Sequence, residues 1–165
     1  MTKRLILMRH AKSDWSHDLA DHDRPLNKRG KLAAQSLGDW LRENGFVPDQ
    51  IWCSSAKRTC ETFEGLALDI APLFTRSLYL AEPADLMAAA QASTGDCVLL
   101  IAHNPGIAWF AHQLLAQIPR HPKFAQYPTG ATLVVDFDIV SWDQLQIGHG
   151  QRVDFVVPRE LSSRG

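Results

Sequence analysis

Two histidines and two arginines lie at three points of this sequence where a short strand-like run gives way to polar residues. The three points are Arg9-His10, the segment 54–58 with Arg58, and His103-Asn104. Each follows a run typical of a buried strand, at 4–8, 50–53 and 97–102. Ligands in open α/β sheets bind just outside the carboxyl ends of the strands. We therefore expect these side chains to converge at one edge of a sheet.

Such a set of side chains suits phosphoryl transfer. The reaction needs an in-line nucleophile and positive charge around the equatorial oxygens of the phosphoryl group. Arginine supplies that charge with forked donors that match phosphate. A neutral imidazole can attack phosphorus when a carbonyl holds its other nitrogen as N–H. His10 would be the nucleophile, Arg9 and Arg58 the clamps, and His103 a protonated second donor.

Each of these residues also has an ordinary structural interpretation. A histidine after a buried strand is often a hydrogen-bonded core residue, and Arg58 on a helix is often a solvated charge. Ser54 and Ser55 are common helix caps. Unrelated explanations would have to coincide at three strand ends, so the combination favours a functional site.

The remaining pattern predicts an α/β fold. Helices are expected over 27–44, 56–68 and 83–92, and another is expected to begin with Asn104 as N-cap and Pro105 as first helical residue. Further strands are expected at 131–138 and 152–157, a short strand with a turn within 72–79, and an irregular loop at 11–26. Alternating strands and helices predict a single three-layer α/β/α domain with a mostly parallel central sheet, spanning residues 1–165.

Composition argues against several classes of protein. The net charge of −1 over 165 residues gives no basic field, so neither nucleic acid nor a membrane is an expected partner. The apolar run before Arg9 is too short for a signal peptide or a membrane span. Three cysteines without a CxxC spacing indicate free thiols, and we expect a cytoplasmic protein. The histidines form no metal motif and arginine already neutralises phosphate, so no metal and no cofactor are expected.

Three segments resemble motifs of the histidine phosphatase superfamily, which includes the cofactor-dependent phosphoglycerate mutases. Arg9-His10-Ala11 resembles its Arg-His-Gly signature, residues 54–62 resemble its second segment, and 102–105 resemble the segment that carries the second histidine. Residues 8–13, 23–30 and 103–106 are similar to the short phosphohistidine phosphatases of the SixA type. The resemblance spans residues 3 to about 137 and implies a phosphoglycerate mutase-like fold.

The resemblance also implies roles for single residues. His10 would become a phosphohistidine intermediate, while Arg9, Arg58 and His103 would hold the phosphoryl group. Ser13 and Arg24 occupy loop positions from which family members reach the phosphate.

A further donor follows from the predicted helix start. At the beginning of its helix, the backbone N–H of Asn104 would be placed to point at an anion.

Two departures from the family pattern bear on the substrate. Ala11 replaces the glycine after the nucleophile, and Thr75-Arg76 stands where many members place a glutamate general acid. Glu82 and Asp85 are the available substitutes, although carboxylates at a helix start have an ordinary role. An alkoxide leaving group needs a proton. Phosphohistidine has a labile P–N bond, and its imidazole can leave already protonated.

These observations favour a phosphohistidine phosphatase. Its partner would be a phosphorylated protein, such as a histidine phosphotransfer domain or carrier, because the chain has no obvious long insertion to form a lid. One alternative is a general phosphomonoesterase that acts on a small phosphate ester. Another is a phosphoprotein-binding module without turnover, although such a module has no need of the nucleophile His10.

Overall fold

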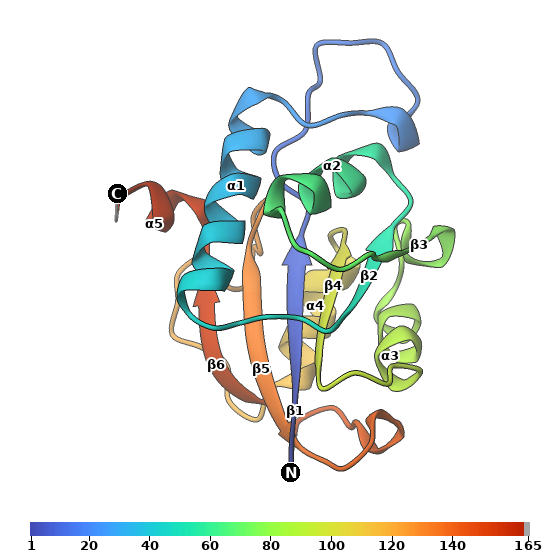
Figure 1. Ribbon diagram of the computed structural model, residues 1–165, viewed down its shortest axis with the longest axis vertical. Helices are drawn as coiled ribbons and strands as arrows, with labels where there is room; N and C mark the ends of the chain where they lie inside the picture. The colour runs from blue at the N-terminus through green and yellow to red at the C-terminus, as the bar shows by residue number, and fades with distance from the viewer. Residues whose placement is uncertain (164–165) are drawn as a thin grey trace.

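The computed structural model describes residues 1–163, which form a mixed sheet of six strands between two layers of helices (Figure 1). The strands follow the order β3-β2-β4-β1-β5-β6 across the sheet. Only β5 opposes the others, because β1 pairs in parallel with β4 and antiparallel with β5. The bounds are β1 (Thr2–Arg9), β2 (Gln50–Ser54), β3 (Leu73–Thr75), β4 (Cys97–Ala102), β5 (Thr132–Asp138) and β6 (Gln151–Val156).

Alternating apolar side chains on the central strands create the two faces of the sheet. On β1, Ile6 and Met8 pack toward α1 (Lys28–Glu43) and α2 (Lys57–Leu66), whereas Leu5 and Leu7 pack toward α3 (Pro83–Gln91) and α4 (Gly106–Leu114). All four side chains are fully buried. Successive side chains on a strand point to opposite faces of the sheet, so a strand of apolar residues must be covered by helices on both faces. The expected three-layer α/β/α fold is therefore confirmed.

The register of β1 against β4 places the two histidines together. Arg9 lies opposite Ala102, and the N–H of His10 donates to the Ala102 carbonyl over 3.1 Å. His10 and His103 thus leave the sheet side by side. The loop after β1 lies at this end of the sheet (Figure 1).

Local structure differs from the sequence-based expectation at three places. Helix α4 begins at Gly106, with Pro105 as N-cap, because the Asn104 side chain donates to the Gln126 and Tyr127 carbonyls instead of capping the helix. The loop at 11–26 contains a short 3-10 turn at Asp21–Asp23. Helix α5 (Pro158–Ser163) was not expected and lies beside α1 (Figure 1). No helix within the described residues is long and apolar enough to cross a bilayer.

Close packing of α1 on α2 depends on Gly38. A Cβ atom at this position would lie 2.3 Å from the Leu66 carbonyl oxygen, which belongs to the backbone. Alanine normally stabilises a helix interior relative to glycine by about 1 kcal/mol. We expect the opposite sign for Gly38→Ala, a loss of about 1–3 kcal/mol in the free energy of unfolding, because the helices must separate.

Urea unfolding measures this effect, with Gln35→Ala on the exposed side of α1 as the control. The control should change the free energy of unfolding by less than about 0.5 kcal/mol. A Gly38→Ala protein as stable as the wild type would show that the α1–α2 contact is not tight.

Candidate active site

A cavity of about 300 Å³ lies at the carboxyl end of the sheet, where the predicted residues converge. Seven of the residues singled out in the sequence line it, namely Arg9, His10, Ser13, Arg24, Arg58, His103 and Asn104. They come from the ends of β1 and β4, from the loop after β1 and from α2. Lys12, Trp15, Asp21, Leu80 and Thr129 complete the lining.

The imidazole of His10 is buried and held in one tautomer. The side chain is 5% exposed, and Nδ1 lies 2.7 Å from the Ala11 carbonyl oxygen. A carbonyl only accepts, so Nδ1 carries the proton and Nε2 carries the lone pair. Burial lowers the pKa of His10 to about 3, and nearby Arg9 and Arg58 act in the same direction. His10 is therefore a neutral imidazole with an unprotonated Nε2 at neutral pH.

His103 faces His10, with ring centroids 5.3 Å apart. Burial, then the proximity of His10 and Arg58, lowers the pKa of His103 to about 2. The ring is thus neutral here, in contrast to the protonated donor expected from the sequence. Its Nε2 lies 2.7 Å from Ser54 Oγ, which also accepts the Ala56 N–H, so the Ser54 hydroxyl proton is available to donate to Nε2. With the Ser54 hydroxyl as the donor, the ring proton of His103 lies on Nδ1.

Several donors around the cavity are buried without a partner. His103 Nδ1, Arg9 Nε and Arg58 Nε have no hydrogen bond to any part of the chain that the structure describes. A buried donor without an acceptor costs about 1–3 kcal/mol. Burial and the charge of Arg58 also lower the pKa of Arg9. This concentration of unpaired donors and positive charge suits an oxyanion.

Asp21 organises the arginines from the loop after β1. Its carboxylate accepts from Arg58 Nη2 over 3.0 Å, from Arg24 Nη1 over 2.6 Å and from the Tyr79 hydroxyl. Its backbone carbonyl accepts from Arg58 Nη1 over 2.6 Å. Burial pushes the pKa of Asp21 upward, but the three hydrogen bonds outweigh it and hold the pKa well below its usual range. Asp21 is therefore ionised and cannot donate a proton.

Ser13 and Arg24 form a second layer of the cavity wall. Arg24 Nε donates to Ser13 Oγ over 3.1 Å, and the guanidinium carbon lies 3.6 Å from the ring centroid of Trp15. Both Ser13 and Arg24 are buried, whereas Trp15 is 76% exposed. The loop thus places one exposed aromatic ring at the mouth of the cavity.

The two carboxylates considered as general acids lie elsewhere. Glu82 and Asp85 are exposed at the start of α3, and neither lines the cavity. The Glu82 N–H donates to the Asp85 carboxylate over 3.1 Å, as in a helix cap. The structure therefore does not bring these two residues to the histidines.

Tyr127 supports the floor of the cavity from below. Its carbonyl accepts from Arg9 Nη1 over 3.2 Å and from Asn104 Nδ2 over 3.0 Å. Its buried hydroxyl donates to the Leu7 carbonyl over 2.6 Å and accepts from the Leu133 N–H. The residue has a left-handed backbone with φ of 49°. No feature of the sequence distinguished Tyr127, Asp21 or Tyr79 as site residues.

Thr62 holds the backbone next to His10. Its Oγ1 accepts the Ala11 N–H over 3.0 Å and donates to the Arg58 carbonyl over 2.7 Å. Thr62 is the last residue of the second motif segment, but no role followed from the sequence. It links the turn after β1 to helix α2, and it thereby connects His10 with Arg58.

Removing this link should loosen the site. Thr62→Val keeps the shape but leaves the buried Ala11 N–H without an acceptor, which costs about 1–3 kcal/mol of unfolding free energy. Thr62→Ser retains the hydroxyl and should recover most of this loss. Chemical denaturation of both variants measures the difference. Equal stability of the two variants would contradict a hydrogen-bonding role for Oγ1.

The lowered histidine pKa values predict a pH dependence of stability. The unfolded chain binds a proton at each histidine below about pH 6.5, whereas folded His10 stays neutral to about pH 3. Stability present above pH 6.5 is therefore lost as pH falls, by about 1.4 kcal/mol per pH unit for each such histidine.

His10→Ala removes one of these histidines and should flatten the profile. As pH falls from 6 to 4.5, the free energy of unfolding of the wild type should drop by about 1.4 kcal/mol per pH unit relative to that of the variant. Unfolding curves at four pH values measure the shift. Parallel profiles would show that folded His10 takes up a proton as readily as the unfolded chain.

Comparisons with known proteins agree with this geometry. A model described as the histidine phosphatase superfamily (branch 1) matches residues 5–78. A protein from Mycobacterium tuberculosis (strain ATCC 25618 / H37Rv) is 32% identical over 160 residues, which cover 92% of this chain and all of that protein.

Two solved structures have similar folds and similar lengths. A protein from Nakamurella multipartitia that carries the name phosphohistidine phosphatase SixA superposes with a TM-score of 0.86 at 25% identity, over 96% of this chain and 97% of that one. A protein of the same name from Agrobacterium tumefaciens has a TM-score of 0.78 at 27% identity, over 94% and 98% of the two chains. The chain therefore belongs to the histidine phosphatase superfamily and is of the short SixA type.

Proposed function

We propose that this phosphatase removes the phosphoryl group from phosphohistidine in a protein, through a phosphorylated His10. The observation that carries the proposal is the buried, neutral His10 ring, whose Nδ1–H is fixed by the Ala11 carbonyl while Nε2 keeps its lone pair. A histidine in this state needs no activating base to attack phosphorus. The names of the two SixA structures support the same substrate class.

The first step transfers the phosphoryl group to the enzyme. His10 Nε2 forms a bond to phosphorus while the bond from phosphorus to the substrate nitrogen breaks. The substrate ring carries a proton on its other nitrogen and leaves as a neutral imidazole. Arg9 and Arg58 then stabilise the charge on the equatorial oxygens.

His103 adds a donor that does not depend on prior protonation. Its Nδ1–H lies buried without a partner in the described part of the chain and is available to a phosphoryl oxygen. A phosphoryl dianion also opposes the charge effect of the arginines and so favours a proton on both nitrogens of His103. Asn104, Ser13 and Arg24 complete the wall around the phosphoryl group.

The second step returns His10 to its starting state. Water attacks phosphorus, the bond between phosphorus and Nε2 breaks, and the water proton ends on inorganic phosphate. His10 leaves as a neutral imidazole, because Nδ1 has kept its proton throughout.

The ionised state of the carboxylate in the cavity favours a phosphoramidate substrate over a phosphate ester. Among the residues that line the cavity, Asp21 is the carboxylate, and it is held ionised by Arg24, Arg58 and Tyr79. An ester oxygen leaves as an alkoxide and gains about 10²–10⁴-fold from a general acid. An imidazole that leaves with its own proton has no such need.

We expect kcat/KM for a phosphohistidine peptide to exceed that for the matched phosphoserine peptide by about 10²–10⁴-fold. His10→Ala should lower turnover of phosphohistidine by roughly a thousandfold or more and abolish the acid-labile phosphoenzyme. His149→Ala, at an exposed histidine outside the cavity, is the matched control and should keep wild-type activity.

Three results would reject parts of this proposal. Full activity of His10→Ala would show that His10 is not the nucleophile. Comparable turnover of both peptides would favour a general phosphomonoesterase. Binding of phosphopeptide by the wild type without release of phosphate would favour a binding module.

A further inference from the structure

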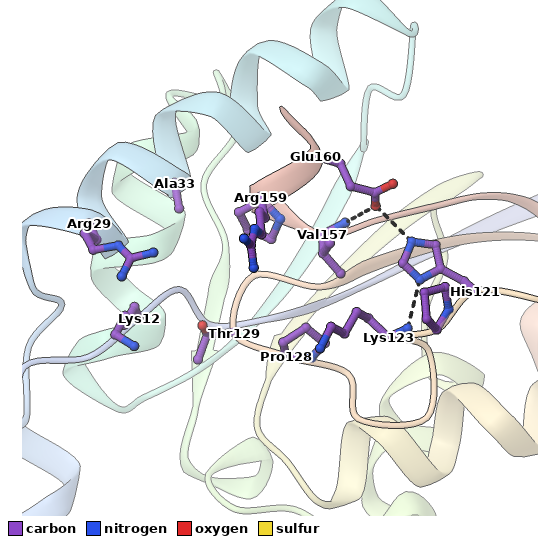
Figure 2. A pocket seen from close by; sticks show the side chains of 12 residues that line it. Lys12, Arg29, Ala33, His121, Lys123, Pro128, Thr129, Val157, Arg159 and Glu160 are labelled. Atoms are coloured by element: carbon purple, nitrogen blue, oxygen red, sulfur yellow. Dashed lines mark hydrogen bonds and ion pairs between the residues drawn. The ribbon is translucent and has the colours of Figure 1, made fainter. Parts of the chain in front are cut away.

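A second and larger cavity opens beside the candidate active site. Its volume is about 740 Å³, and Lys12 and Thr129 line both cavities. Helix α1, the loop at 121–129 and the start of α5 form its walls. Figure 2 shows Lys12 and Arg29 at one end of this cavity and His121 with Glu160 at the opposite end. The cavity therefore runs from the edge of the candidate active site toward His121.

Positive charge is spread along this cavity. Lys12, Arg29 and Lys123 line it, and none of the three forms an ion pair within the described chain. The one carboxylate among the described lining residues, Glu160, lies at the far end, where its Oε1 accepts from His121 Nε2 over 3.0 Å and from the Val157 N–H over 3.1 Å.

Apolar groups form most of the remaining wall. The side chains between the charged positions are small or aliphatic, and they are Ala33, Pro122, Pro128, Val157 and Pro158. A site with an apolar wall and a few placed charges is typical of a cavity that binds a ligand much larger than a phosphate ion. The cavity is also more than twice as large as the one around His10.

We propose that this cavity binds an acidic, partly apolar segment of the phosphorylated protein, next to the residue that carries the phosphoryl group. The inference rests on the proposed function and extends it to the surroundings of the phosphorylated residue. The shared residue Lys12 places the segment in continuity with the phosphoryl group at His10.

The size of the cavity favours a peptide segment over a compact anion. Lys12 and Arg29 lie at the end near the active site, whereas Lys123 projects from the loop that carries His121 (Figure 2). One phosphate or carboxylate group would fill only a small part of a cavity of about 740 Å³. An extended segment, with its residues spaced by about 3.3 Å, can fill the cavity and bring acidic side chains to all three cations.

The test compares three substrates on the 165-residue chain. They are a phosphohistidine peptide flanked by aspartate and leucine, the same peptide flanked by lysine and leucine, and phosphoramidate, which is too small to reach the second cavity. We expect the wild type to prefer the acidic peptide to the basic one by about tenfold in kcat/KM, with the preference falling at high salt.

The double variant Arg29→Glu, Lys123→Glu should abolish or invert this preference. Both side chains are exposed, and a glutamate in the first turn of α1 suits the helix dipole, so folding is preserved. Turnover of phosphoramidate should change by less than about twofold. The matched control Lys31→Glu, Arg152→Glu carries the same change in charge outside the cavity and should keep the wild-type preference.

The outcomes separate this inference from the proposed function. Phosphoramidate turnover by His10→Ala tests the proposed chemistry alone, and we expect it to be lost. Equal turnover of acidic and basic peptides by the wild type would overturn the inference while leaving the chemistry intact. An equal loss in the cavity variant and the control variant would also overturn it, because the effect would then come from net charge.

Discussion

The parallel register of β1 against β4 determines which side chains meet at the edge of the sheet. Arg9 lies opposite Ala102, so the two histidines that follow these residues leave adjacent strands at the same level. A shift of one residue would turn His10 toward the opposite face, because successive side chains on a strand alternate. Buried apolar residues on both faces of both strands penalise such a shift. Packing of the core therefore fixes the spacing of His10 and His103.

Once this register is set, electrostatics determines the state of each group. Burial is the main reason that both imidazoles stay neutral, and the positive charges of Arg9 and Arg58 act in the same direction. One carboxylate, Asp21, offsets part of this charge and orients two of the arginines. Neutral imidazole is the nucleophilic form, so the proposed nucleophile His10 stays in its reactive state among the arginines that would hold the phosphoryl group.

Much of the fold was predictable because its signals are local. Continuous apolar runs marked β1 and β4, helical periodicity marked α1, and the ends of these elements marked Arg9-His10 and His103. Asp21 and Tyr127 could not be found in this way. Their roles come from contacts with residues far away in the sequence, such as Arg58 and Arg9, and one aspartate among several in a polar loop carries no distinguishing pattern. The start of α4 was misplaced because the Asn104 side chain bonds to a distant loop.

Tyr127 shows how one position can be restricted in two opposite ways. Its left-handed backbone aims the carbonyl at Arg9, and this conformation costs a non-glycine residue about 1 kcal/mol or more. Glycine would avoid that cost, but it lacks the phenol that lies between Leu7 and Leu133. Phenylalanine would keep the ring and lose the hydroxyl. Few replacements satisfy both demands, so sequence drift at this position should be slow even though Tyr127 does not line the cavity.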